Sequence, residues 1–158
     1  MEKIIVGIAE GKTAMCGQSL VSYALGSCVG VCLYDRERRI AGMAHIVLPE
    51  KGEAYRRDNA YEFADEAVFR LLEDMRHMGA DPRHITAKIA GGARMFATVN
   101  RTWEIGDKNV AAVKKALQKA GIVLAAEDTG KDYGRTITFY ADSGKLEIST
   151  VRHQNILL

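Results

Sequence analysis

Cysteine and histidine are the residue types of this sequence best suited to nucleophilic chemistry at neutral pH, and the chain has 3 cysteines and 4 histidines. A thiol becomes a strong nucleophile when a neighbouring imidazole takes its proton. His45 lies in an otherwise apolar run, residues 40–48. An imidazole in such a run needs a hydrogen-bond partner or a function. The other histidines occupy the end of an expected helix, the start of an expected strand and a polar tail: His77, His84 and His153.

Cys28 is the cysteine that strand pairing can bring to His45. It follows a Gly-Ser break at the start of a β-type run, where a thiol is exposed and a backbone N–H is free to face an oxyanion. If a hairpin places Asp35 opposite Ile40, Cys28 faces Val47. His45 then shares the face of Cys28, on a diagonal of about 7–8 Å between Cα atoms. A slip of one residue would put the two on opposite faces, and the alternative role of Cys28 is that of a small buried hydrophobe.

The remaining cysteines are expected to be structural, reduced thiols. Cys28 and Cys32 lie about 13 Å apart along an intact strand, against a limit of roughly 7 Å for bridged Cα atoms. A zinc site needs three or four convergent ligands, and the sequence has no CxxC or HxxxH spacing. We therefore expect no disulfide, metal or other cofactor. The Gly91-Gly92 pair lacks the Lys-Ser/Thr ending of a P-loop and indicates close backbone packing.

Composition narrows the class of protein. The chain has 158 residues with 47% apolar and 27% charged side chains, which suits a single globular domain spanning residues 1–158. The formal net charge of +2 does not favour nucleic acid as a partner. No apolar run is long enough for membrane insertion, and the first residues lack the pattern of a signal peptide. A cytoplasmic location is the resulting expectation.

The order of elements predicts an α+β fold with mixed, largely antiparallel β-sheet layers and two main helices packed on the sheet faces. A polar loop is expected at residues 50–59. Asn59, with Glu62 three residues on, has the spacing of a capping box and predicts the start of the first helix. The second helix is expected at residues 108–120. Strands are expected at residues 4–9, 15–18, 20–25, 28–34, 40–48, 84–90, 122–126, 136–140 and 146–150.

Several motifs together resemble a known family. The stretch SYALGSCVGVC at residues 22–32, followed by GMAHIVLP at residues 42–49, resembles the CheD family of chemoreceptor glutamine deamidases. The similarity continues in the same order over nearly the whole chain, in AKIAGGA at residues 87–93 with Met95 and Phe96, in Ile105-Gly106 with Asn109, in residues 121–130, and in Gly134-Arg135. Ser22 stands where the family commonly has threonine, and Lys108 where arginine is usual.

The resemblance implies a cysteine hydrolase that converts receptor glutamines to glutamates. Some members of the family also hydrolyse receptor glutamyl methyl esters. The implied partners are the cytoplasmic domains of chemoreceptors, as substrate, and the CheC phosphatase. The implied catalytic residues are Cys28, His45 and Ser22. Ser27 and Phe96 are candidate contacts with substrate or partner, although Phe96 also fits the role of an ordinary core aromatic.

The expected mechanism begins with a hydrogen bond from Cys28 to His45 that leaves a thiolate–imidazolium pair. The Ser22 hydroxyl would hold the imidazole in its productive tautomer, the third role of a catalytic triad. Two other functions stay open at this point. One is a non-catalytic binding module that regulates the CheC phosphatase, and the other is a thiol hydrolase with a different amide substrate.

Overall fold

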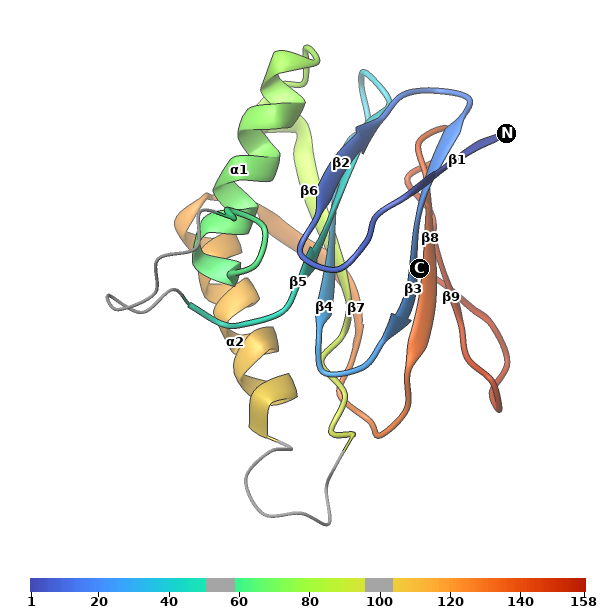
Figure 1. Cartoon of the computed structure of the whole chain (residues 1–158). Helices are drawn as coiled ribbons and strands as arrows, with labels where there is room; N and C mark the ends of the chain where they lie inside the picture. Colours follow the sequence, from blue (N-terminus) through green and yellow to red (C-terminus); the bar gives the residue numbers. More distant parts are fainter. Residues whose placement is uncertain (51–58, 96–103) are drawn as a thin grey trace.

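The computed structural model describes residues 1–50, 59–95 and 104–158, and it arranges them in three layers (Figure 1). A layer of two helices covers a central sheet with the strand order β2-β5-β4-β6-β7, and an outer sheet with the order β1-β3-β8-β9-β10 packs on the other side. The helices are α1 (Ala64–His77) and α2 (Glu104–Lys119). The strands are β1 (Glu2–Ile5), β2 (Gly11–Ala14), β3 (Gln18–Leu25), β4 (Val29–Asp35), β5 (Ile40–Ile46), β6 (Ile85–Gly91), β7 (Val123–Thr129), β8 (Arg135–Tyr140), β9 (Leu146–Ser149) and β10 (Ile156–Leu157).

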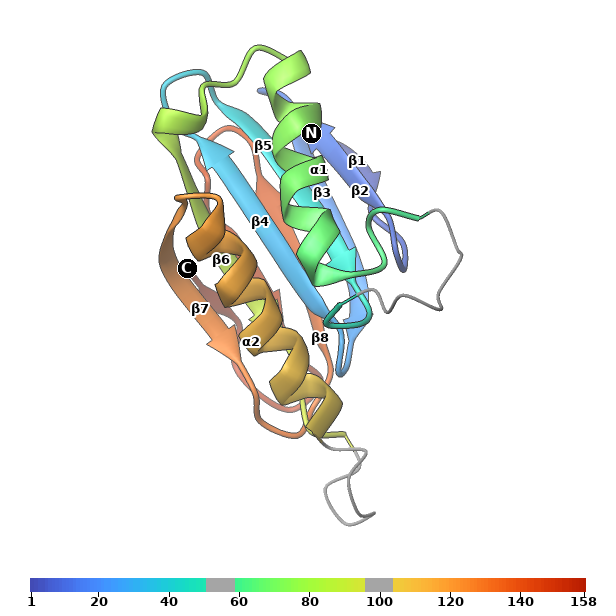
Figure 2. The same cartoon turned by 90° about the vertical axis from the view of Figure 1, so that its left-hand side faces the viewer.

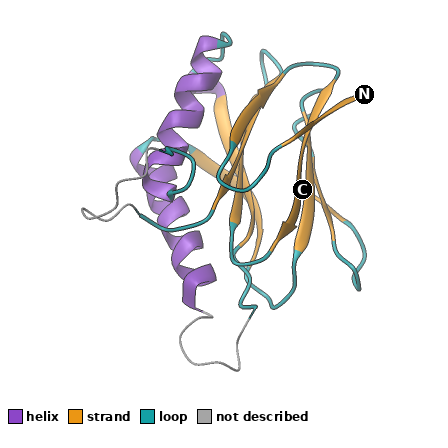
Figure 3. Ribbon diagram, in the orientation of Figure 1, coloured by secondary structure: helices purple, strands orange, loops and turns teal. Residues whose placement is uncertain are grey.

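The predicted α+β class is confirmed, with two details that the sequence pattern did not give. Both helices lie on the same face of the central sheet (Figure 2), so the outer sheet shields the opposite face. Most strand pairs are antiparallel, but β1 pairs with β3, and β6 with β7, in parallel. The second of these pairs is joined through α2. Figure 3 shows how the two kinds of element separate into layers. None of the helices in the described ranges is long and apolar enough to cross a membrane.

The expected start of the first helix is wrong. The helix begins at Ala64, and its N-cap residue Phe63 makes no side-chain capping bond. Asn59 instead accepts a hydrogen bond from the Tyr61 N–H, 3.0 Å away, in a turn before the helix. The helix begins later than expected because the backbone before it bonds to the chain just after β5: the Ala64 N–H donates to the Leu48 carbonyl at 3.0 Å. Tertiary backbone bonds thus replace the local capping signal.

Strand β4 is buried along its whole length because both of its faces are covered. Val29, Val31 and Leu33 pack in the core between the central sheet and the helices. Cys32 and Tyr34 pack in a second core between the two sheets. This double burial explains why the strand is a continuous apolar run rather than an alternating one.

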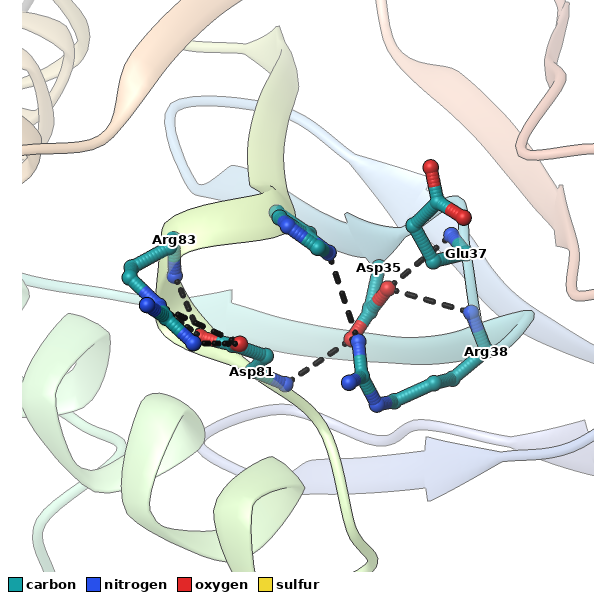
Figure 4. Close-up of polar contacts among 6 residues, drawn as sticks. Asp35, Glu37, Arg38, Asp81 and Arg83 are labelled. Carbon is teal, nitrogen blue, oxygen red and sulfur yellow. Dashed lines mark hydrogen bonds and ion pairs between the residues drawn. The ribbon is translucent and has the colours of Figure 1, made fainter.

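A buried carboxylate, Asp35, closes the β4–β5 hairpin (Figure 4). It accepts hydrogen bonds from the backbone N–H groups of Glu37 at 3.0 Å and Arg38 at 3.1 Å, and from the Asp81 N–H at 2.8 Å. The Arg38 guanidinium lies 3.4 Å away. Burial alone would raise the pKa of Asp35, but these donors outweigh it and the pKa is lowered. The charged carboxylate therefore ties the turn to the segment that precedes β6.

This hairpin has the register predicted from the sequence. Asp35 pairs with Ile40, and Gly30 pairs with His45. Because side chains alternate along a strand, Cys28, two residues before Gly30, turns toward the same face as His45. That face is the one that looks into the space between the two sheets.

Candidate active site

The loop that carries Cys28 joins β3 to β4 and is held through its carbonyl groups. The donors come from the segment after β6 and from α2, which lie at the same end of the molecule (Figure 1). The three bonds are Ala93 N–H to Gly26 O at 2.9 Å, Asn109 Nδ2 to Ser27 O at 2.9 Å, and Gly92 N–H to Cys28 O at 2.8 Å. Three consecutive carbonyl groups of the loop thus accept hydrogen bonds. The Cys28 N–H itself donates to no backbone carbonyl of the described residues. It remains available as an oxyanion donor.

The Gly91-Gly92 pair permits this close approach of β6 to the loop that carries Cys28. Gly91 has φ +113° and Gly92 has φ +66°, conformations that L side chains rarely adopt. A Cβ on Gly91 would lie 2.3 Å from the Cys28 carbonyl oxygen. The expected role of the pair in backbone packing is therefore confirmed, and the backbone that it packs against belongs to Cys28.

The imidazole of His45 crosses the space between the sheets to reach Ser22 on β3. His45 is 3% exposed and Ser22 is fully buried, and His45 Nδ1 lies 2.8 Å from Ser22 Oγ. The Ser22 hydroxyl donates its own hydrogen to the Val6 carbonyl, 2.9 Å away. A hydroxyl has one hydrogen, so Nδ1 must supply the hydrogen of the bond that it shares with Ser22. The network fixes the tautomer protonated on Nδ1.

The other ring nitrogen, Nε2, consequently carries a free lone pair. It is buried and has no hydrogen-bond partner among the described residues. The thiol of Cys28 lies on the same face, half-buried against the core between the sheets. A buried acceptor without a partner costs free energy, and it is the chemical group that a general base needs.

Burial acts against the expected thiolate–imidazolium pair, which stays a prediction. Among the described residues no hydrogen bond joins Cys28 to His45. Burial raises the pKa of the Cys28 thiol, opposed only by its own N–H, and burial lowers the pKa of His45. Desolvation disfavours the charged form of both groups, so burial favours the neutral thiol and the neutral imidazole.

The structure places one of the two candidate contact residues and describes all three cysteines. Ser27 is half-buried in the loop that carries Cys28, and Phe96 lies outside the described residues. Cys16 is exposed, Cys28 is half-buried and Cys32 is buried, and all three thiols are free in the structure. Over residues 1–50, 59–95 and 104–158 no cluster of side chains could hold a metal ion.

Sequence reasoning missed two groups of the site. The Val6 carbonyl left no signal in the sequence, because a backbone group has no residue type. Asn109 did leave one, since it is a polar residue one helical turn before Val113 on the buried side of α2, and both are fully buried. Its amide donates to the Ser27 carbonyl in the loop that carries Cys28 and, at 2.9 Å, to the Val47 carbonyl just beyond β5.

A thiol, an imidazole oriented by a hydroxyl, and a backbone N–H that donates to no carbonyl of the described residues are groups found together in cysteine hydrolases. The chain belongs to the CheD family. Residues 47–150 match the family model described as CheD chemotactic sensory transduction, and curated relatives match nearly the whole chain.

Two of these relatives have the name "Probable chemoreceptor glutamine deamidase CheD". The one from Caldanaerobacter subterraneus is 43% identical over 94% of this chain and 93% of its own. The one from Clostridium novyi is 43% identical over 95% of this chain and 94% of its own. A third, "CheD 2" of Geobacter metallireducens, is 44% identical over 96% of both chains. Among solved structures, the hypothetical protein YfiH of Bacillus licheniformis is 20% identical, with a TM-score of 0.45, over 75% of this chain and 49% of that chain.

Proposed function

We propose that this protein hydrolyses glutamine side chains of chemoreceptors to glutamates, with Cys28 as nucleophile, His45 as base and Ser22 as the group that orients the base. The relatives' names support the reaction and the substrate. The observation that carries the residue assignment is the Ser22–His45 bond of 2.8 Å, which leaves Nε2 unprotonated on the face of the Cys28 thiol, with no hydrogen-bond partner among the described residues.

Acylation starts from neutral groups. As the Cys28 sulfur attacks the amide carbon of the substrate glutamine, its proton passes to His45 Nε2, so thiolate forms only in step with attack. Such positioned proton transfer contributes typically about 10²–10⁴-fold in rate. The tetrahedral oxyanion accepts a hydrogen bond from the Cys28 N–H, and loss of one such donor costs about 3–4 kcal/mol.

Breakdown of the intermediate returns the proton. Imidazolium gives it to the leaving nitrogen, ammonia departs, and a thioester joins Cys28 to the substrate. A water molecule then attacks the thioester carbonyl while Nε2 takes a proton from it. Collapse expels the thiolate, which regains that proton, and the product is glutamate. Through both steps the charge on His45 is stabilised by Ser22, a neutral hydroxyl whose hydrogen is committed to Val6.

Glutamyl methyl esters are a second substrate class for the same groups. The thioester is identical, and methanol rather than ammonia takes the proton from His45. Receptor esters of this kind therefore belong to the proposal. The CheC phosphatase is proposed as a protein partner on the family resemblance alone.

The test is the conversion of glutamine to glutamate in the purified cytoplasmic domain of a chemoreceptor, read by peptide mass spectrometry together with ammonia release. Cys28→Ala is expected to abolish conversion. Cys16→Ala, which removes an exposed thiol, is the matched control and keeps activity. Conversion that persists in Cys28→Ala rejects the mechanism.

The binding-module alternative gives a different result in the same experiment. Wild-type protein would then leave the receptor unchanged while it binds the CheC phosphatase, as measured by calorimetry with purified CheC. Hydrolysis of free glutamine or of unrelated amides, with the receptor untouched, would instead point to a thiol hydrolase with another substrate.

A further inference from the structure

We propose that Asn109 is a positioning residue: its side-chain amide ties the segment that carries Cys28 to the segment that carries His45. The inference rests on the proposed function, because it assigns to Asn109 the spacing of the thiol and the imidazole. Asn109 is fully buried on α2 and contacts neither reacting group through any described hydrogen bond.

One nitrogen makes both connections. Nδ2 of Asn109 donates to the Ser27 carbonyl at 2.9 Å and to the Val47 carbonyl at 2.9 Å. Ser27 directly precedes Cys28, and Val47 follows His45 by two residues. Both hydrogens of the NH₂ group are therefore used, one on each side of the catalytic pair.

No main-chain ladder joins these segments at this level. The pairing of β4 with β5 ends at Val29 and Ile46, one residue short of the nucleophile. Beyond that point the Asn109 side chain links the two segments through its hydrogen bonds to the Ser27 and Val47 carbonyls. Its neutral amide supplies two donors from a single atom without burying a charge.

Two further features concern the position of α2 and the orientation of the Asn109 amide. Gly106, one turn earlier on the helix, lies so close to the chain after β6 that a Cβ would be 2.5 Å from the Ala93 carbonyl oxygen. The Asn109 Oδ1 atom is buried with no partner among the described residues. The flipped amide would point that oxygen at two carbonyl oxygens, so the orientation is set by the two acceptors.

The experiment compares Asn109→Ala with two controls on the same helix. Gln118→Ala removes an exposed amide, and Val113→Ala removes buried packing one turn away without touching either carbonyl. For Asn109→Ala we expect kcat for receptor glutamine conversion to fall by about 10- to 100-fold while KM changes by less than about 3-fold, since misplacement of reacting groups acts on the chemical step. Each variant is assayed at a temperature where its folded fraction equals that of the wild type. Under these conditions the two control variants are expected to retain kcat within about 3-fold of wild type.

A second measurement needs no substrate. The rate of Cys28 alkylation by iodoacetamide is followed against pH by peptide mass spectrometry, in a Cys16→Ser background. A released loop exposes the thiol, so its pKa falls from the value that burial has raised, and the alkylation midpoint moves to lower pH in Asn109→Ala. A more acidic thiol together with a slower enzyme is the signature of lost alignment.

Each result bears on the inference separately from the proposed function. A folded Asn109→Ala with wild-type kcat and an unmoved alkylation midpoint overturns it, and so does a kcat loss equal to that of Val113→Ala. If Asn109→Ala does not fold, Asn109→Ser, whose hydroxyl is too short to span both carbonyls, takes its place under the same criteria. A wild-type protein that converts no receptor glutamine refutes the proposed function, while the alkylation midpoints still decide whether Asn109 holds the loop.

Discussion

Ser22 and His45 join the two sheets of this protein through a hydrogen bond of 2.8 Å between the serine hydroxyl and Nδ1 of the imidazole. The bond has a direction, because the serine hydrogen is committed to the Val6 carbonyl. The bond therefore determines which ring nitrogen carries the hydrogen and which carries the lone pair. In this way a buried serine on the outer sheet sets the tautomer of a histidine on the central sheet.

Removal of the Ser22 hydroxyl should slow the reaction more than it weakens substrate binding. In Ser22→Ala the imidazole loses both its orienting partner and the dipole that stabilises imidazolium. We expect kcat to fall by about 10- to 100-fold with little change in KM. Ser22→Thr retains the hydroxyl and stiffens its rotamer, so it should match or exceed wild type. Ser19→Ala, at another buried serine of β3, is the control, and an unchanged kcat in Ser22→Ala would remove Ser22 from the site.

Activity should depend on pH through His45. Burial lowers the pKa of this imidazole, and only the neutral form can accept the thiol proton. As pH falls, kcat/KM is therefore expected to stay flat through neutrality and to drop only below the ordinary range of histidine. A pH profile of kcat/KM measures this fall in activity on the acidic side. His77→Ala, which removes an exposed imidazole, is the control and should leave the profile unchanged. An acidic limb at or above the ordinary histidine pKa would contradict the neutral resting pair.

Gly91→Ala should disturb both the fold and the site. Its φ of +113° is strained for alanine, and the added methyl would lie 2.3 Å from the Cys28 carbonyl oxygen. Gly79→Ala provides a control with a similar φ of +101° and open space around the new methyl. We expect the control to lose about 1–2 kcal/mol of unfolding free energy and to keep kcat. Gly91→Ala should lose more stability and most of its activity, as measured by urea unfolding and receptor conversion; equal effects of the two changes would refute the steric argument.

The Asp35 carboxylate should contribute stability that depends on pH. Its pKa in the folded protein is lowered, because the N–H donors of Asp81, Arg38 and Glu37 outweigh burial. The contribution is fully present above the unfolded pKa, about 3.9, and is lost as pH falls through the lowered folded value. Asp35→Asn keeps the shape but loses the charge-assisted bonds, and it is expected to cost about 1–3 kcal/mol at neutral pH.

Chemical unfolding at pH 7 and at pH 3 measures this dependence. The difference in stability between wild type and Asp35→Asn should shrink at the lower pH. Asp132→Asn, at an exposed aspartate, is the control. A difference that is the same at both pH values would show that the charge of Asp35 has no part in the hairpin.

Much of the local structure follows from the sequence alone. The α+β class, a strand at the place of β4 and the hairpin register were all predictable, because apolar runs and turn residues act over a few neighbours. The start of α1 was not, because the capping pattern at Asn59 competes with backbone bonds to the residues just after β5. Residues distant in the chain decided that boundary.

For the candidate site, the sequence by itself determined which groups are present: one cysteine after a Gly-Ser break and one histidine in an apolar strand, on the same face of a hairpin. Only the tertiary structure decided their state. The tautomer of His45 depends on a hydroxyl 23 residues away and a carbonyl on another segment, and burial shifts the pKa values of both groups, upward for Cys28 and downward for His45. The physical reason is that strand alternation is a local property, whereas desolvation and the direction of a hydrogen bond depend on what the folded chain packs around each group.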